Sequence, residues 1–150
     1  MKVFIDTNVV LENFLRREDY DVAHRLFEVL QAQGHTVFIS SGSFYSMIFL
    51  VDKYLKKELG IFGDDRIVAI RQIMSSVLKV VSVAGHDNES LLRGINDGRF
   101  TDLEDSCQHQ AAVKAGCDCL ISFNLKDYAN GASIKAMTPR DFLDSLLEKK

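Results

Sequence analysis

The sequence predicts a three-layer α/β/α sandwich built on a central, mainly parallel sheet of about five strands. The first observation is length, because 150 residues suit one ordinary domain. The second is composition: 47% hydrophobic and 26% charged residues with one proline are typical of a globular protein with a real core. The third is order, because short β-branched runs alternate with longer helical segments. Such alternation favours βαβ crossovers, so we expect residues 1–150 to form a single domain of this class.

Five short apolar runs predict the strands of this sheet. Several of them end at a polar residue or a glycine, as strands that run into turns do. The runs cover residues 3–5, 36–39, 79–83, 119–122 and, as the weakest candidate, 134–137.

The segments between these runs predict helices, because their apolar residues recur every three or four positions. The predicted helices cover residues 19–33, 43–57, 65–78 and 102–115. A capping box of Thr101 and Glu104 would open the last of these and place Asp102 in its first turn, where the helix dipole favours an anion. A final helix begins with Thr138 as N-cap and Pro139 at the first helical position.

Bulk properties exclude several classes of protein. A net charge of −3 argues against a protein that coats nucleic acid by positive charge alone. The longest nearly apolar run, residues 44–51, is far shorter than the roughly 20 residues that span a bilayer. Asp6 interrupts the apolar stretch that a signal peptide needs, so we expect a cytoplasmic protein without membrane contact.

The cysteines give little support for a metal site. There are three, an odd number, and Cys117 and Cys119 would share one face if both lay on a strand. No second pair of Cys or His at zinc-ligand spacing accompanies them, so we expect buried, reduced thiols.

Acidic and amide side chains follow the predicted strands where a parallel sheet would gather them. Asp6 ends the first strand, Asn124 and Asp127 follow the fourth, and Asp105 lies early in the helix that precedes it. Ligands of such sheets bind beyond the carboxyl ends of the strands. Carboxylates gathered there repel one another unless a hard divalent cation neutralises them. Mg²⁺ or Mn²⁺ is the expected occupant, and it would activate water and stabilise charge on a phosphoryl group.

Each of these residues also has a structural interpretation. Asp6 could cap a turn, and turn chemistry alone could explain Asn124 and Asp127. Asp105 is different, because it lies about 200° around the helix from Leu103 and past the positions that a cap needs. His109, one turn later, could contact Asp105, although a solvated or supporting histidine is the more common case.

Taken together, these segments resemble the PIN domain, a metal-dependent nuclease fold of many bacterial toxins. The resemblance runs nearly from end to end and rests on the order and spacing of four segments rather than on one motif. They are residues 3–8, 102–106 with the alanines at 111 and 112, 120–128, and 137–143.

The resemblance implies a Mg²⁺- or Mn²⁺-dependent ribonuclease that cleaves single-stranded RNA. It assigns the catalytic and metal-binding positions to Asp6, Asp105, Asp127 and Asn124. It assigns supporting positions to Thr7, Asn8 and Ser122, and Asp102 or Glu104 could partly compensate for a missing carboxylate. One position departs from the family: Ser46 stands where an acidic residue is usual, and fewer charged ligands should weaken cation binding.

Two hypotheses from different classes follow. In the first, the protein is a ribonuclease and the toxin of a toxin–antitoxin pair, kept inactive by its partner protein. It would form a homodimer through the apolar surface of the helices in residues 44–78. In the second, which Ser46 motivates, it is a catalytically degenerate PIN-like module that binds RNA or a protein without cleavage. A phosphatase that forms a phospho-Asp6 intermediate is a third alternative.

Overall fold

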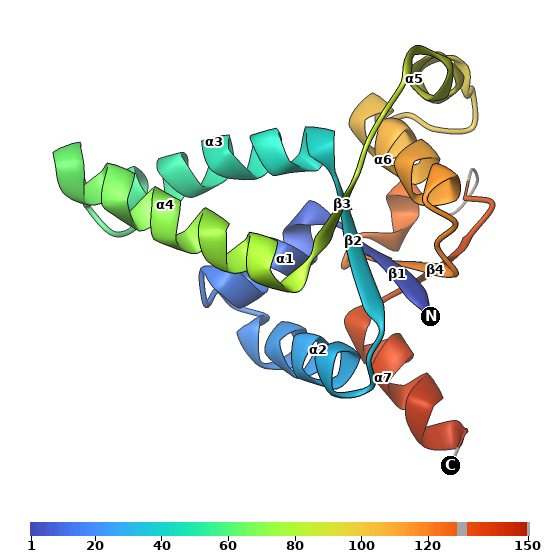
Figure 1. Ribbon diagram of the computed structural model, residues 1–150, viewed down its shortest axis with the longest axis horizontal. Coiled ribbons are helices and arrows are strands. Elements are labelled where there is room, and N and C mark those ends of the chain that lie inside the picture. Colours follow the sequence, from blue (N-terminus) through green and yellow to red (C-terminus); the bar gives the residue numbers. More distant parts are fainter. Residues whose placement is uncertain (129–131, 150) are drawn as a thin grey trace.

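Parallel strands form the centre of the molecule. Within residues 1–128 and 132–149, which the computed structural model describes, five strands run in the order β3-β2-β1-β4-β5, and every pairing is parallel (Figure 1). The strands are β1 (Lys2–Ile5), β2 (Thr36–Ser40), β3 (Ser82–Ala84), β4 (Cys119–Ile121) and β5 (Lys135–Met137). This confirms the predicted α/β architecture on a parallel sheet.

Both faces of the sheet are buried, and alternate residues of each strand supply them. Val3 and Ile5 of β1 point into one apolar cluster, whereas Phe4 points into another on the opposite face. The same division separates Ile121 from Leu120 on β4. Because side chains alternate along a strand, the short apolar runs of the sequence become the middle layer of a sandwich.

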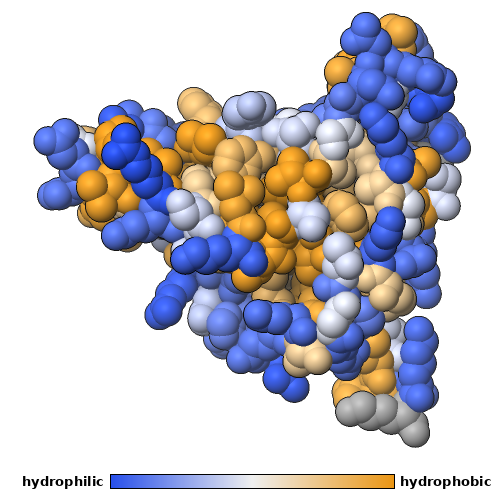
Figure 2. All heavy atoms as spheres, viewed as in Figure 1, coloured by the Kyte–Doolittle hydropathy of each residue, from blue (hydrophilic) through white to orange (hydrophobic). Residues whose placement is uncertain are grey.

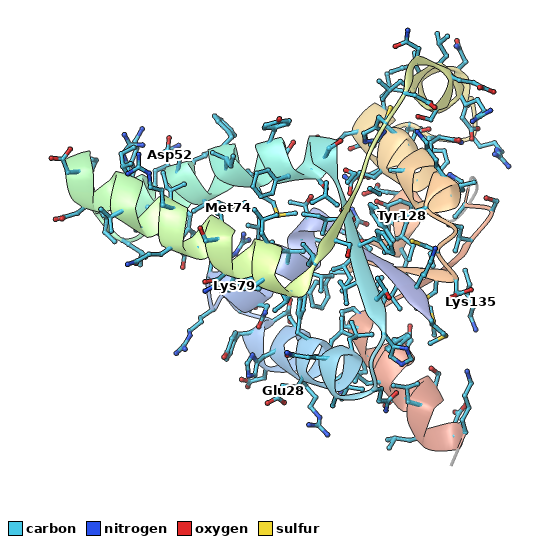
Figure 3. All side chains as sticks on the ribbon, in the orientation of Figure 1. Glu28, Asp52, Met74, Lys79, Tyr128 and Lys135 are labelled. Atoms are coloured by element: carbon cyan, nitrogen blue, oxygen red, sulfur yellow. The ribbon has the colours of Figure 1, made fainter. Side chains whose placement is uncertain are left out.

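Most helices cover the face that holds Val3 and Ile5. Five of them contribute buried residues to that cluster: α1 (Thr7–Phe14), α2 (Tyr20–Ala32), α3 (Ser41–Lys57), α4 (Gly63–Val80) and α7 (Pro139–Glu148). In Figure 1, α3 and α4 run side by side and project away from the sheet. Met74 on the inner side of α4 is buried, and Arg66 of α4 forms an ion pair with Asp52 of α3 (Figure 3).

The opposite face is covered by α6 (Leu103–Lys114), and α5 (Asn88–Asn96) packs onto α6. The two helices approach so closely that a Cβ atom on Gly94 would lie 2.9 Å from the Cys107 sulfur and 3.1 Å from the Cys107 Cα. The Ser106 hydroxyl donates to the Gly94 carbonyl at 2.7 Å. Gly94 is therefore the residue that lets α5 lie against the helix carrying Asp105.

The ends of several elements differ from the sequence-based prediction. The run at residues 79–83 is not a strand throughout, because α4 continues to Val80 and β3 begins only at Ser82. The capping box of Thr101 and Glu104 is wrong: Asp102 is the N-cap, and its side chain accepts from the backbone N–H of Asp105. Asp102 and Asp105 have the same three-residue spacing one position later in the chain, and the helix begins with this pair.

Two helices were not predicted. The helix α1 follows β1 directly, with Asp6 as its N-cap, and is only eight residues long. The helix α5 buries Ser90 and Gly94 but exposes leucines, so its apolar residues do not mark its packed face. The last helix is confirmed as predicted, with the Thr138 hydroxyl accepting from the Asp141 N–H at 3.1 Å and Pro139 at its start.

Two further observations complete the fold. Cys117 precedes β4 and packs into the cluster of Phe4, whereas Cys119 packs into that of Val3, so the expected shared face for the two thiols is wrong. Burial raises the pKa of each thiol to about 11, and both are free cysteines. Among the described helices, none has the length and apolar character needed to cross a membrane.

Candidate active site

The two central strands β1 and β4 end side by side, and the polar residues that follow them meet. The Asp6 backbone N–H donates to the Ile121 carbonyl at 2.9 Å. This bond extends the hydrogen bonding between β1 and β4 by one residue beyond the end of β1. Asp6 then leaves β1 to cap α1, while Ser122 leaves β4. This places both side chains at the carboxyl edge of the sheet, where parallel sheets bind their ligands.

Asp6 is held by three donors in a buried position, with 5% of its surface exposed. Its Oδ1 accepts from the Thr7 N–H at 2.7 Å, and its Oδ2 accepts from the Ser122 hydroxyl at 2.8 Å and the Tyr128 hydroxyl at 3.2 Å. Burial raises the pKa of Asp6, while the hydrogen bonds from Ser122, Thr7 and Tyr128 act in the opposite direction. The carboxyl group is therefore fixed in direction, at a site that disfavours its charge.

Asp105 approaches the same place from α6 and is also buried, with 9% of its surface exposed. Its Oδ1 accepts from the Tyr128 hydroxyl at 3.3 Å. Burial raises the pKa of Asp105 to about 8, and the nearby carboxylates of Asp6, Asp127 and Asp102 contribute in the same direction. Leu103, the apolar residue about 200° around the helix from Asp105, is exposed, and Asp105 lies on the packed face.

Tyr128 joins the two carboxyl groups. Its side chain is 1% exposed and lies beside α6, with its ring edge-to-face against Phe100 at 6.2 Å (Figure 3). Burial and the charges of Asp6 and Asp105 raise the pKa of the phenol, so the hydroxyl keeps its proton and acts as a donor. We refer to Asp6, Asp105, Ser122 and Tyr128 as the carboxylate network.

Asn8 supports this network from the first turn of α1. Its side-chain amide donates to the Ser122 hydroxyl oxygen at 3.3 Å, and its Oδ1 accepts from the Phe123 N–H at 3.3 Å. The Asn124 N–H also donates to the Ser122 oxygen, at 3.0 Å. The Ser122 proton is therefore directed toward Asp6, because its oxygen already accepts from two amides.

Asn124 and Asp127 form a separate pair next to the network. The Asn124 amide donates to Asp127 Oδ2 at 2.6 Å across the short 3₁₀ helix η1 (Leu125–Asp127). Asn124 is exposed and Asp127 half-buried. Asp127 is near enough to raise the pKa of Asp105 through a side-chain hydrogen bond and its charge, and the pKa of Asp6 through its charge. The pair thus flanks the buried carboxylates on the solvent side.

The remaining predicted residues lie at three different places. The Thr7 hydroxyl is buried, and it makes no hydrogen bond to any described residue. Asp102 is exposed and caps α6. Ser46 lies half-buried on α3, and no hydrogen bond within residues 1–128 and 132–149 joins its side chain to the carboxylate network.

The charges of the network are not balanced by cationic side chains. None of the ion pairs between described residues includes Asp6, Asp105 or Asp127. Oxygen-only donors of this kind match the preference of Mg²⁺ and Mn²⁺. In the part of the chain that the structure describes, however, no three His, Cys, Asp or Glu side chains are grouped closely enough to hold a metal ion. The oxygen donors of Asp6 and Asp105 therefore suit a divalent cation. In this structure, however, the Tyr128 hydroxyl contacts both carboxyl groups.

Sequence reasoning missed Tyr128 as a site residue and misplaced His109. Tyr128 directly follows Asp127 in a loop, and its hydroxyl is the signal that could have drawn attention to it. His109 is not solvated, and its described hydrogen bonds go to Ser133 rather than to Asp105. It is buried, its ring packs on Phe100, and its Nε2 accepts from the Ser133 N–H at 2.9 Å.

Comparison with known proteins finds similar sequences and similar folds. Ribonuclease VapC1 of Aquifex aeolicus is 24% identical over 145 residues, which cover 95% of this chain and 94% of that protein. A crystal structure of VapBC2 from Rickettsia felis, bound to a promoter DNA fragment, aligns with a TM-score of 0.69 at 14% identity, covering 92% of this chain and 98% of that one. A toxin–antitoxin complex from Klebsiella pneumoniae aligns with a TM-score of 0.61 at 18% identity, covering 91% and 97%.

The family model of the PIN domain matches residues 2–126. That span includes the strands β1 to β4, both buried carboxylates, and the loop from Ser122 to Lys126. This chain belongs to the PIN domain family.

Proposed function

We propose that this protein is a divalent-metal-dependent ribonuclease that cleaves single-stranded RNA, and that it acts as the toxin of a toxin–antitoxin pair. The observation that carries the proposal is the meeting of Asp6 and Asp105 at one buried hydroxyl, without a cationic side chain paired to either. The similarity to ribonuclease VapC1 and to a toxin–antitoxin complex supports it.

The cation would be held by Asp6, Asp105 and Asp127, with the Asn124 carbonyl oxygen assisting. These are hard oxygen donors. Burial first, and the neighbouring carboxylates second, raise the pKa values of Asp6 and Asp105, and a cation would favour the charged forms of both groups. When bound, Mg²⁺ or Mn²⁺ supplies activation of water and stabilisation of charge on the phosphoryl group.

The chain's own residues would orient these ligands. Thr7 and Ser122 fix the two oxygens of Asp6, and Asn8 fixes Ser122. Asp102 holds the first turn of α6 by accepting from the Asp105 N–H, which fixes the backbone that carries the Asp105 side chain. Residues that orient metal ligands in this way typically change metal affinity 10–100-fold when they are removed.

We further propose that the exposed apolar side of α3 and α4 is a protein interface, used by an antitoxin and by a second copy of the chain. Figure 2 shows a broad hydrophobic surface where α3 and α4 meet the rest of the molecule. We call the two helices with the turn between them, residues 41–80, the α3–α4 arm. Its exposed apolar side chains include Tyr45, Phe49, Leu50, Phe62, Ile67 and Val68. An exposed patch of this kind is typical of interaction sites.

A catalytically degenerate PIN module that binds RNA or a protein without cleavage is the second candidate. Ser46 favours it, because a hydroxyl on α3 would provide no negative charge for the cation. The two candidates differ in what they require of the buried carboxylates. A binding module needs neither Asp6 nor Asp105 to be ionised, whereas a metal-dependent nuclease needs both.

Cleavage of labelled single-stranded RNA in Mn²⁺ separates the candidates. We expect the wild-type protein to cut the RNA and Asp6→Asn and Asp105→Asn each to lower the rate about 100-fold or more, since each removes a cation ligand. Asp144→Asn, at an exposed position of α7, is the matched control and should leave the rate unchanged.

Two results would count against the nuclease. Full activity in both Asp6→Asn and Asp105→Asn would place the site elsewhere in the chain. Intact RNA with wild-type protein, together with no heat of Mn²⁺ binding in calorimetry, would favour the binding module.

A further inference from the structure

Tyr128 occupies the place between Asp6 and Asp105 where their oxygens face each other. Its hydroxyl lies 3.2 Å from Asp6 Oδ2 and 3.3 Å from Asp105 Oδ1. A phenol has one proton, so it cannot make a full hydrogen bond to both carboxyl groups at once. Both distances exceed the 2.7–2.8 Å that is usual for an O–H donor to oxygen. The proton is therefore shared between two acceptors rather than committed to one.

The other hydroxyl that donates to Asp6, that of Ser122, is arranged differently. Ser122 lies at 2.8 Å from Asp6 Oδ2, and its oxygen accepts from the amides of Asn8 and Asn124. Replacing that contact would disturb three hydrogen bonds. Tyr128 has no such further partner among the described residues, and apart from its hydroxyl the side chain is held by apolar packing, including the ring of Phe100. Of the two hydroxyls, that of Tyr128 is the easier one to replace.

We propose that the Tyr128 hydroxyl is a stand-in for the cation. In the metal-free protein this hydroxyl holds Asp6 and Asp105 together, and it is replaced when Mg²⁺ or Mn²⁺ binds. This inference rests on the proposed function, since it assumes that the two carboxylates bind a metal. It explains how two buried carboxyl groups without a paired cationic side chain remain close in the absence of the ion. It also makes Tyr128 a positioning residue that competes with the metal.

Competition gives a result opposite to that of an ordinary supporting residue. Tyr128→Phe keeps the ring and its packing but removes the shared proton. The metal-free variant should unfold at a lower temperature than wild type, because Asp6 and Asp105 lose the donor between them. Its affinity for Mn²⁺, measured by calorimetry, should rise about tenfold, since no hydrogen bond has to be broken first. A residue that merely supports the ligands would lower the affinity instead.

The composition of the chain offers a readout that needs no activity. The protein has no tryptophan and four tyrosines, so its near-ultraviolet absorbance reports tyrosine directly. Adding Mg²⁺ to wild-type protein should change the tyrosine absorbance, because the Tyr128 hydroxyl loses its carboxylate partners. Tyr128→Phe should abolish that change. Tyr20→Phe, at a half-buried side chain that stacks on His24, is the matched control and should retain it.

The outcomes separate this inference from the proposed function. If wild type binds Mn²⁺ and Tyr128→Phe binds it with equal or lower affinity, the stand-in role is wrong while the metal site stands. A wild-type protein that binds Mg²⁺ without a tyrosine signal leads to the same conclusion, and it does so without relying on a variant. If neither protein binds a divalent cation, the proposed function and this inference both fail.

Discussion

In most proteins charged side chains lie at the surface and large apolar side chains lie in the core. The carboxylate network and the α3–α4 arm depart from this pattern in opposite ways. In the network, Asp6 and Asp105 are almost completely buried and have no ion-pair partner among the described residues. In the arm, Phe49 is 66% exposed and Phe62 63% exposed. Charged residues are rarely buried unless they are paired, and large exposed apolar patches are rare on isolated proteins.

The difference indicates what each region lacks. A buried, unpaired carboxylate is stabilised by a cation, and an exposed aromatic surface is stabilised by another protein surface. The network is therefore expected to respond to metal ions and pH, whereas the arm is expected to respond to partner concentration. Predictions for the two regions can be tested independently, because a response of the wrong kind in either region would contradict its assignment.

The largest expected effect concerns pH and the network. The pKa of Asp105 is raised in the folded protein to about 8 from 3.8. Between about pH 4 and pH 8 the unfolded chain releases this proton while the folded chain keeps it, so stability falls as pH rises, by a few kcal/mol in order of magnitude. Mn²⁺ favours the ionised carboxylate and should reduce or reverse the fall near pH 8. Thermal unfolding across this range, with and without Mn²⁺, measures both effects.

Asp105→Asn is the control for this pH dependence. The variant has no proton to release at that position, so its stability should fall less over the same pH range than that of wild type, with Asp6, whose pKa burial also raises, giving the remaining fall. If the variant lost stability with rising pH as steeply as wild type, Asp105 would not be the group responsible for the fall.

The next effect concerns the hydroxyl that orients Asp6. Ser122→Ala should lower Mn²⁺ affinity 10–100-fold in calorimetry, because Asp6 loses its shortest hydroxyl donor and Asn8 loses an acceptor. It should also lower the free energy of unfolding by about 1–3 kcal/mol, as a buried acceptor is left without its donor. Ser76→Ala, which removes an exposed hydroxyl bonded within α4, should do neither. Unchanged affinity in Ser122→Ala would mean that Asp6 is not a ligand.

A smaller effect concerns the close contact that positions α6. Gly94→Ala places a methyl group 2.9 Å from the Cys107 sulfur and 3.1 Å from the Cys107 Cα. Overpacking of this kind costs about 1–3 kcal/mol, and the better helix propensity of alanine offsets roughly 1 kcal/mol of it. We expect a net loss of stability in urea unfolding. Gly98→Ala, with no atom within 4 Å of the new methyl group, should be neutral or slightly stabilising, and equal results for both would contradict the close approach of α5 and α6.

The smallest effect on stability is expected in the α3–α4 arm. Phe49→Ser should change the free energy of unfolding by no more than about 0.5 kcal/mol, because the ring is exposed. It should nevertheless weaken self-association in sedimentation experiments, if the arm is the interface that we propose. Met47→Ala, two residues away on the buried side of α3, should instead cost about 2–5 kcal/mol. A Phe49→Ser protein that associates like wild type would exclude this part of the arm from the interface.

The fold could be predicted from the sequence because its strands are short continuous apolar runs, and that pattern is typical of a sheet buried on both faces. The helix α5 could not be predicted in this way. It packs against α6 at Gly94 and buries Ser90, whereas its leucines Leu91 and Leu92 are exposed. The start of α6 was misread by one residue, because Thr101 with Glu104 and Asp102 with Asp105 have the same spacing. Only tertiary packing decides between two such overlapping patterns.

For the candidate site, the sequence indicated which acidic residues share an edge of the sheet but not how they are held. The positions of Asp6 and Asp105 follow from the strand and helix that carry them. The bridging hydroxyl of Tyr128 depends on a ring packed in a distant loop, and in the sequence such a ring is indistinguishable from an ordinary core aromatic residue. Contacts between segments far apart in the chain leave no local signal.

The most direct test of the central claim is a crystal structure of the wild-type protein soaked with Mn²⁺, examined by anomalous scattering. We expect one strong manganese peak beside the carboxyl groups of Asp6 and Asp105, with the Tyr128 hydroxyl moved away from at least one of them. A soaked crystal with no peak between these two carboxylates, or with manganese bound only elsewhere on the protein, would contradict it.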